Sequence, residues 1–111
     1  MQSQEVCVKV NPGICGLPCI FLVHKIDKYK AHIKIVEAKC AKIRKMTEEI
    51  KEIGVRDLFA SITSNPVYLA AHKAGCHASC IVPVAILKAT EVAMEMALPQ
   101  SATIELIDGH N

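Results

Sequence analysis

The chain has 111 residues, of which 51% are hydrophobic and 22% charged. This balance excludes a disordered chain, and the length fits a single domain spanning residues 1–111 with one hydrophobic core. The formal net charge is only +2, and the two Tyr and two Phe residues are accompanied by no Trp. These counts exclude the basic, aromatic-rich surface that is typical of nucleic-acid binding.

The sequence also predicts a cytoplasmic protein. Its most apolar segment, residues 81–98, is interrupted by Lys88, Glu91 and Glu95, so we expect no membrane span there. The first five residues carry neither a basic region nor a long apolar run, so we expect no secretory signal. In a reducing compartment, six cysteines favour free thiols with a metal or redox role over a disulfide framework.

The first third of the chain has the pattern of three antiparallel strands. Alternating valines predict a strand over residues 5–10, which Asn11-Pro12-Gly13 ends. Branched and aromatic residues predict further strands over residues 20–26 and 31–38, and the polar segment 27–30 has the composition of a hairpin turn. Short links between consecutive strands indicate an antiparallel meander.

Apolar residues at steps of three and four predict four helical segments after the strands, at residues 43–53, 56–62, 67–73 and 84–97. Gly54 and Gly75 follow the first and third of these, as helix-terminating residues do. Alternation of apolar residues between positions 102 and 107 predicts a final strand. The predicted fold class is therefore α+β, with a three-stranded antiparallel meander followed by helices and a C-terminal strand.

Five of the six cysteines fall in loops or at the ends of the predicted elements. Cys15 and Cys19 lie between the first two strands, Cys40 follows the third strand, and Cys76 and Cys80 precede the last helix. Strand ends and helix starts on one edge of an α+β domain can converge, so several of these thiols could surround one ion. Soft thiolates select zinc, copper(I) or iron–sulfur clusters over hard cations.

The segment just before the last predicted helix is the strongest candidate site. It places two thiols, an imidazole and a hydroxyl before Pro83, a residue suited to the first helical turn. Unpaired N–H groups and the helix dipole favour negative charge there, so we expect a lowered pKa at Cys80. His77, or His72 four residues before Cys76, could supply a nitrogen ligand.

The remaining cysteine and histidines are predicted to be structural. Cys7 lies within the first strand, and free cysteine is among the most buried residue types, so we expect it in the core. His24 and His32 lie on strands and His110 near the C-terminus, and we expect each to be a surface or packed side chain. The sequence contains no phosphate-binding loop, dinucleotide glycine fingerprint, nucleophile elbow or catalytic carboxylate pair. We therefore expect a binding role rather than an enzyme.

The order of elements and thiols resembles the iron–sulfur cluster assembly scaffold family of the IscU and NifU N-terminal type. Members of that family have three antiparallel strands followed by helices, and three cysteines hold a cluster or zinc. Here Cys15-Gly16 resembles the family's Cys-Gly loop, Cys40 its cysteine at the first long helix, and Cys80 its cysteine before the last helix. The resemblance covers residues 6–97 and implies the same fold, an assembly or carrier role, and partners such as a cysteine desulfurase or cluster acceptors.

The chain also departs from that family's pattern. Leu17 stands where the family has an acidic residue that assists cluster release, and His77-Ala78-Ser79-Cys80 replaces a His-Cys pair. The family's Leu-Pro-Pro-Val-Lys chaperone-recognition segment is absent. Additional thiols at Cys19 and Cys76 favour a retained over a transferred cluster. The Asn-Pro-Gly-x-Cys-Gly opening and Cys-x-Val-Pro ending also resemble small proteins from anaerobes, which implies no function.

The leading hypothesis is a metal-binding protein that holds an iron–sulfur cluster or zinc. Its ligands are predicted to be Cys15, Cys40 and Cys80, with Cys76, Cys19 or His77 as the further ligand. Two alternatives stay open. One is a sulfur relay without metal, in which Cys80 or Cys76 carries a persulfide and has a depressed pKa. The other is an interaction domain in which the cysteines only pack.

Overall fold

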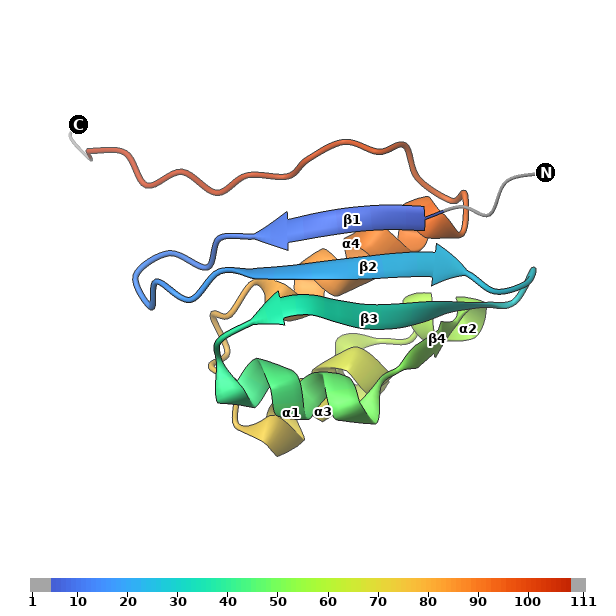
Figure 1. The fold of residues 1–111 in the computed structure, drawn as a ribbon, viewed down its shortest axis with the longest axis horizontal. Coiled ribbons are helices and arrows are strands. Elements are labelled where there is room, and N and C mark those ends of the chain that lie inside the picture. Colours follow the sequence, from blue (N-terminus) through green and yellow to red (C-terminus); the bar gives the residue numbers. More distant parts are fainter. Residues whose placement is uncertain (1–4, 109–111) are drawn as a thin grey trace.

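The computed structural model describes residues 5–108, which form one sheet with helices against it (Figure 1). His110 lies outside these residues. In chain order the elements are β1 (Glu5–Val10), β2 (Cys19–Lys25), β3 (Lys30–Ala38), α1 (Ala41–Glu49), β4 (Glu52–Gly54), α2 (Val55–Leu58), a 3₁₀ turn (Ile62–Ser64), α3 (Pro66–Ala74) and α4 (Val82–Ala93).

The sheet is antiparallel and has the strand order β1-β2-β3-β4. The three predicted strands are confirmed to within one residue at each end. A bulge beside Ile20 and Phe21 shifts the register between β2 and β3. Because of this shift, Cys19 lies opposite Ala38 on β3 and opposite Val10 on β1. One end of β1, β2 and β3 therefore lies at the same end of the sheet, at Val10, Cys19 and Ala38.

The fourth strand was not predicted, and the helix expected over residues 43–53 ends earlier, at Glu49. The backbone of β4 pairs with β3 instead, with Ile53 opposite Ala31, and this pairing buries Ile53 to 1% exposure. Gly54 consequently lies in a strand and does not terminate the helix. An apolar residue at helical spacing can equally satisfy a short buried strand, and here pairing with β3 decides the outcome.

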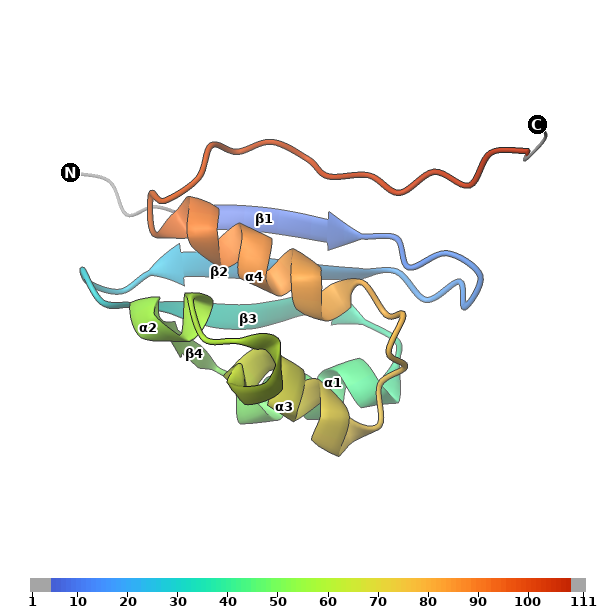
Figure 2. The same cartoon turned by 180° about the vertical axis from the view of Figure 1, so that it is seen from behind.

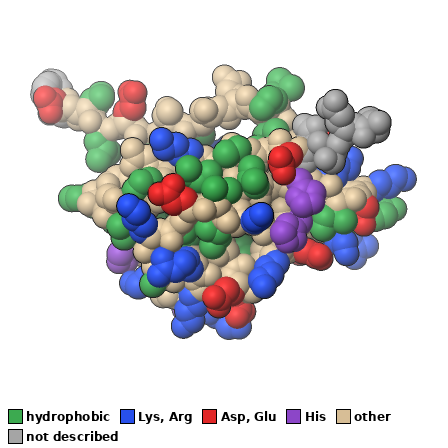
Figure 3. Space-filling view, viewed as in Figure 1, with side chains coloured by type: hydrophobic (Ala, Val, Ile, Leu, Met, Phe, Trp, Pro, Cys, Tyr) green, Lys and Arg blue, Asp and Glu red, His purple; other side chains and the backbone are tan. Residues whose placement is uncertain are grey.

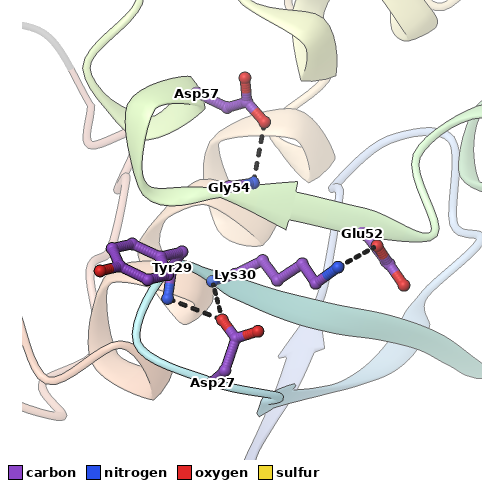
Figure 4. A network of polar contacts seen from close by, with 6 residues as sticks. All are labelled: Asp27, Tyr29, Lys30, Glu52, Gly54 and Asp57. Carbon is purple, nitrogen blue, oxygen red and sulfur yellow. Dashed lines mark hydrogen bonds and ion pairs between the residues drawn. The ribbon is translucent and has the colours of Figure 1, made fainter.

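Local side-chain hydrogen bonds hold the β2–β3 hairpin turn and the start of α2 (Figure 4). Asp27 accepts hydrogen bonds from the backbone N–H groups of Tyr29 and Lys30, at 2.8 and 3.1 Å, which fixes the predicted β2–β3 hairpin turn. Asp57 accepts one from the N–H of Gly54 at 2.8 Å and so caps the start of α2. The two turns meet where Lys30 at the start of β3 lies opposite Gly54 at the end of β4.

The helices cover one face of the sheet (Figures 1 and 2). α4 crosses β1 and β2, whereas α1 and α3 pack on each other beside β3. The core lies between this face and the helices, and its largest fully buried side chains are Phe21, Met46, Ile53, Ile86, Val23, Val67 and Val82. Among residues 5–108, no helix is both long and apolar enough to cross a membrane.

The predicted C-terminal strand is wrong. Residues 101–108 have no regular secondary structure, and Ile104, Leu106 and Ile107 are 73%, 96% and 80% exposed. The last helix also ends at Ala93 rather than residue 97, since Glu95 has a φ of 64°. A strand needs a paired neighbour, and alternation alone does not provide one. The final segment runs along the β1 side of the sheet without pairing to it (Figures 1 and 2).

Candidate metal centre

Five cysteines come from segments that meet at one end of the sheet. The β1–β2 loop, the β3–α1 junction and the α3–α4 connection all lie at this end in both views (Figures 1 and 2). These segments carry Cys15 and Cys19, Cys40, and Cys76 and Cys80 respectively. The predicted convergence of strand ends and helix starts is therefore present in the arrangement of the elements.

The β1–β2 loop presents one exposed and one buried thiol. Gly13 and Gly16 both have positive φ values, 95° and 66°, and the N–H of Gly16 donates to the carbonyl of Gly13 at 2.9 Å. A glycine is the residue that adopts this backbone without strain. The turn leaves Cys15 exposed, whereas Cys19 opens β2 and is 1% exposed.

Cys40 occupies the N-cap position of α1, as predicted. Its backbone carbonyl accepts the first helical hydrogen bond, from the N–H of Arg44 at 3.1 Å, whereas its side chain makes no capping bond. The thiol is half-buried against the edge of the core. It is therefore free to contact another group without disrupting the helix start.

The α3–α4 connection begins with a left-handed residue. Gly75 ends α3 with a φ of 81°, and the N–H of Cys76 donates to the carbonyl of Ala71 at 2.9 Å, a common helix-terminating pattern. The chain then turns, with the N–H of Cys80 donating to the carbonyl of His77 at 3.1 Å. Cys76 and Cys80 are both half-buried against the core edge, whereas His77 between them is exposed.

Electrostatic interactions between the thiols show that they are neighbours. The pKa of Cys19 is raised from 9.0 to about 12, chiefly by burial. Repulsion from the thiolate forms of Cys80, Cys40 and Cys15, in decreasing order, adds to this rise. The pKa of Cys76 is also raised, by burial first and then by Cys80 and Cys40. Cys40 and Cys80 therefore contribute to the raised pKa values of both Cys19 and Cys76.

One cation also belongs to this end of the molecule. The Lys42 ammonium opposes the rise in the pKa of Cys76, and its side chain passes close to Gly75. A positive charge beside several thiols offsets part of the repulsion that would follow their ionisation. Sequence reasoning missed Lys42, because the stretch 42–52 has the alternating charges of an ordinary solvated helix face.

The thiols are close, but a finished coordination shell is not preformed. Within residues 5–108, no three Cys, His, Asp or Glu side chains are already placed to hold a metal ion. Of the two predicted nitrogen donors, His72 lies on α3 in a shallow hollow with Glu49 and Lys73, and His77 is exposed. An ion at this end would have to draw thiols together from separate loops.

The prediction that Cys7 packs in the core is wrong. Its side chain is exposed, because Val6, Val8 and Val10 take the inward positions of β1 and leave Cys7 on the opposite face. Period-two alternation, visible in the sequence, was the better guide here than the general burial of cysteine. Cys7 is thus separate from the other five thiols.

Comparison with known proteins places the chain in a family but assigns no activity. A model described as a family of unknown function, DUF6951, matches residues 6–106. Since the match spans most of the chain, the protein belongs to this family. The chain matches no curated protein and no solved structure.

Proposed function

We propose that this DUF6951 protein binds an iron–sulfur cluster or zinc at the cysteine end of the sheet. The observation that carries the proposal is the convergence of five thiols from three separate segments of chain. Core packing alone would not gather them there, since only Cys19 is fully buried. The proposed ligands are Cys15, Cys40 and Cys80, with Cys76, Cys19 or His77 as the further ligand.

Among the candidate further ligands, Cys76 has the strongest support. It is half-buried and interacts with both Cys80 and Cys40, whereas His77 is exposed. Cys19 interacts with the same two thiols but is 1% exposed, so it would become a ligand only if the site reached into the core. A set of four thiolates around a divalent ion carries two negative charges, and the Lys42 ammonium beside Cys76 would offset part of them.

The raised pKa values at this end disfavour a free thiolate, and a metal ion that binds there must displace protons. The pKa of Cys19 and of Cys76 is raised by burial, so without a cation these thiols stay protonated near neutral pH. A soft cation reverses the balance by binding the thiolate and releasing the proton. The raised pKa of Cys76 likewise counts against its use as the nucleophile of a metal-free sulfur relay.

We further propose a role in iron–sulfur metabolism, based on the resemblance to the IscU and NifU N-terminal type. Four features support this proposal: the antiparallel strands, the Cys15-Gly16 turn, the N-cap position of Cys40 and the place of Cys80 before α4. Leu17 in place of the acidic residue for release supports a retained rather than a transferred cluster. A cysteine desulfurase or a cluster acceptor would be the partner of such a role.

The test is elemental analysis with a UV-visible spectrum on anaerobically purified protein, with and without reconstitution. We expect iron with sulfide and visible charge-transfer bands, or colourless zinc, bound by the cysteine end in at least one equivalent. The Cys40→Ser and Cys80→Ser variants should lose that equivalent, because both thiols are proposed ligands and both act on Cys19 and Cys76. Cys7→Ser is the matched control, since Cys7 is an exposed thiol away from the cluster.

Two outcomes would overturn the proposal. One is equal metal content in the wild type and in both cluster variants. The other is no metal at all together with fast alkylation of one thiol near neutral pH, which would establish the sulfur relay instead. If the protein contains no metal and all its thiols are alkylated slowly, the cysteines have only a packing role.

A further inference from the structure

A row of four titratable side chains crosses the sheet at the end opposite the cysteines. In the strand register, Glu5 lies opposite His24, His24 opposite His32, and His32 opposite Glu52. Each residue comes from a different strand, so the four form one line from β1 to β4. Cys19 begins β2 and His24 lies near its other end, so this row is separate from the cysteine cluster.

All four side chains lie on the face of the sheet that the helices leave open. Their strand neighbours Val23, Ala31 and Ile53 are 0–1% exposed in the core, and successive side chains of a strand point to opposite faces. Figure 3 shows two histidine side chains side by side on this open face, with an acidic side chain near each end of the pair. The row therefore faces solvent, although His24 and His32 are themselves half-buried.

The two imidazoles have a spacing that suits one metal ion. Their ring centroids are 5.4 Å apart and their planes are tilted by 52°. Two imidazoles bound to one tetrahedral zinc through nitrogens at about 2.0–2.1 Å have ring centroids roughly 5 Å apart. The pair thus needs little movement of its backbone or rings to share an ion.

An unpaired nitrogen also points to a missing partner. Nδ1 of His32 has no solvent exposure and no hydrogen-bond partner. Such an atom is unfavourable in a folded protein, and an unpaired polar group in a native structure calls for an explanation such as an ion. A cation between the rings would supply that partner.

The flanking carboxylates can complete the site. Glu52 forms an ion pair with Lys30 at 3.6 Å, and both side chains are about half exposed. Exposed pairs of this kind contribute little stability, so Glu52 can exchange the ammonium for a metal ion. Glu5 is exposed at the other end of the row. Two carboxylates and two neutral imidazoles would neutralise a divalent cation.

We propose that His24 and His32 bind a divalent transition-metal ion on the open face of the sheet, with Glu5 and Glu52 as the completing oxygen ligands. Imidazole and carboxylate together suit zinc. The two imidazoles are positioned by the strand register, and the carboxylates reach the ion by rotating about their side-chain bonds. This site does not depend on the cysteine end.

Calorimetric titration with Zn²⁺ tests the proposal, with the full chain in its reduced form. His24→Gln and His32→Gln should each bind one zinc equivalent fewer than the wild type, whatever number the cysteines bind. His72→Gln is the matched control, because His72 is exposed on α3, away from the row. In the wild type, the ring resonances of His24 and His32 should shift together as the first zinc binds there.

Equal zinc equivalents in the wild type and in both row variants would overturn the proposal and leave the histidines a packing pair. Retained circular dichroism and urea midpoints will show that the variants fold, as expected for side chains on the open face. Glu5→Gln gives a second measure that does not alter the imidazoles. The Glu5→Gln variant should bind zinc about tenfold more weakly. An unchanged affinity would mean that the Glu5 carboxylate is not a ligand.

Discussion

The two ends of the sheet carry metal-binding side chains in different ways. At the cysteine end, the thiols belong to loops and junctions; neither end has a finished coordination shell within the described residues 5–108. At the histidine row, His24 and His32 belong to adjacent strands whose hydrogen bonds fix their spacing. The strands therefore preorganise the row, whereas the loops leave the cysteine cluster to be ordered by its ion.

This difference predicts different energetics for the two sites. Thiolates bind soft cations more tightly, but Cys19 and Cys76, whose pKa values are raised, must lose protons before they can bind. The imidazoles lie opposite each other in the register of β2 and β3 and need little rearrangement. The cysteine end should therefore show tight binding coupled to ordering, and the histidine row weaker binding with little structural change.

The largest expected effect is zinc stabilisation of the cysteine end. In a His24→Gln background, where only the cysteines can bind, zinc at a thousandfold excess over its dissociation constant should raise the free energy of unfolding by about 4 kcal/mol. Urea unfolding with and without zinc measures this rise. The same zinc concentration in a Cys40→Ser background isolates the histidine row, where weaker binding should give a smaller rise. Equal rises in the two backgrounds would contradict the comparison.

The next effect is the alkaline stability of the metal-free protein. The folded pKa of Cys19 is about 12, above its ordinary value of 9.0, so the folded state holds a proton that the unfolded state loses between these values. Stability is thus fully present below pH 9 and falls as pH rises toward 12. Between pH 8 and 10.5 we expect a loss of about 2 kcal/mol.

The measurement is the free energy of unfolding of the metal-free wild type minus that of Cys19→Val at each pH. Subtraction cancels the titration of lysines and tyrosines common to both proteins. A difference that stays flat from pH 8 to 10.5 would mean that Cys19 is not held protonated in the core. Bound zinc should also flatten the difference if Cys19 is one of its ligands, because the metal then holds the thiolate.

A framework residue outside both sites should affect stability without changing metal content. Asn65 is 2% exposed, and its side chain accepts from the N–H of Val67 at 3.0 Å and donates to the carbonyl of Asp57 at 2.8 Å. Asn65→Ala removes the cap of α3 and leaves the N–H of Val67 without its partner, whereas the carbonyl of Asp57 still accepts from the N–H of Ala60; it should cost about 1–2 kcal/mol in urea unfolding. Zinc equivalents measured below the unfolding transition should be unchanged, and a lost equivalent would tie this residue to a site.

The sequence was sufficient for features with local causes. Alternating valines predicted β1, Asn65-Pro66 and Gly75 bounded α3, and the N-cap position of Cys40 followed from the strand and helix on either side. The convergence of the thiols was predicted because strand ends and helix starts share an edge of the sheet. Their identity as metal ligands stays a prediction.

Features that depend on pairing between distant residues were not predicted. Ile53 fits a helical pattern, and only pairing with Ala31 shows that it lies in a strand. Ile104 and its alternating neighbours have a strand pattern but no partner. His24 and His32 are half-buried and packed on each other, which agrees with the expectation of surface or packed side chains, but their opposition was not predicted because it depends on the register of the β2–β3 hairpin. Each of these features depends on which segments pair with each other, and the periodicity of one segment does not contain that information.

The smallest expected effect concerns the competition for Glu52. In the structure Glu52 pairs with the Lys30 ammonium at 3.6 Å, and Lys30→Gln removes both this competitor and a positive charge near the row. Exposed ion pairs contribute about 0.2–1 kcal/mol, so zinc should bind the row about 1.4- to 5-fold more tightly in this variant. Titration in a Cys40→Ser background measures the row alone, with Lys73→Gln as the control because Lys73 pairs with Glu49 away from the row.

The gain in zinc affinity should shrink at high salt, since screening already weakens the Lys30–Glu52 ion pair there. Weaker zinc binding in Lys30→Gln would mean that Glu52 needs this lysine for its position and is not a ligand held back by it.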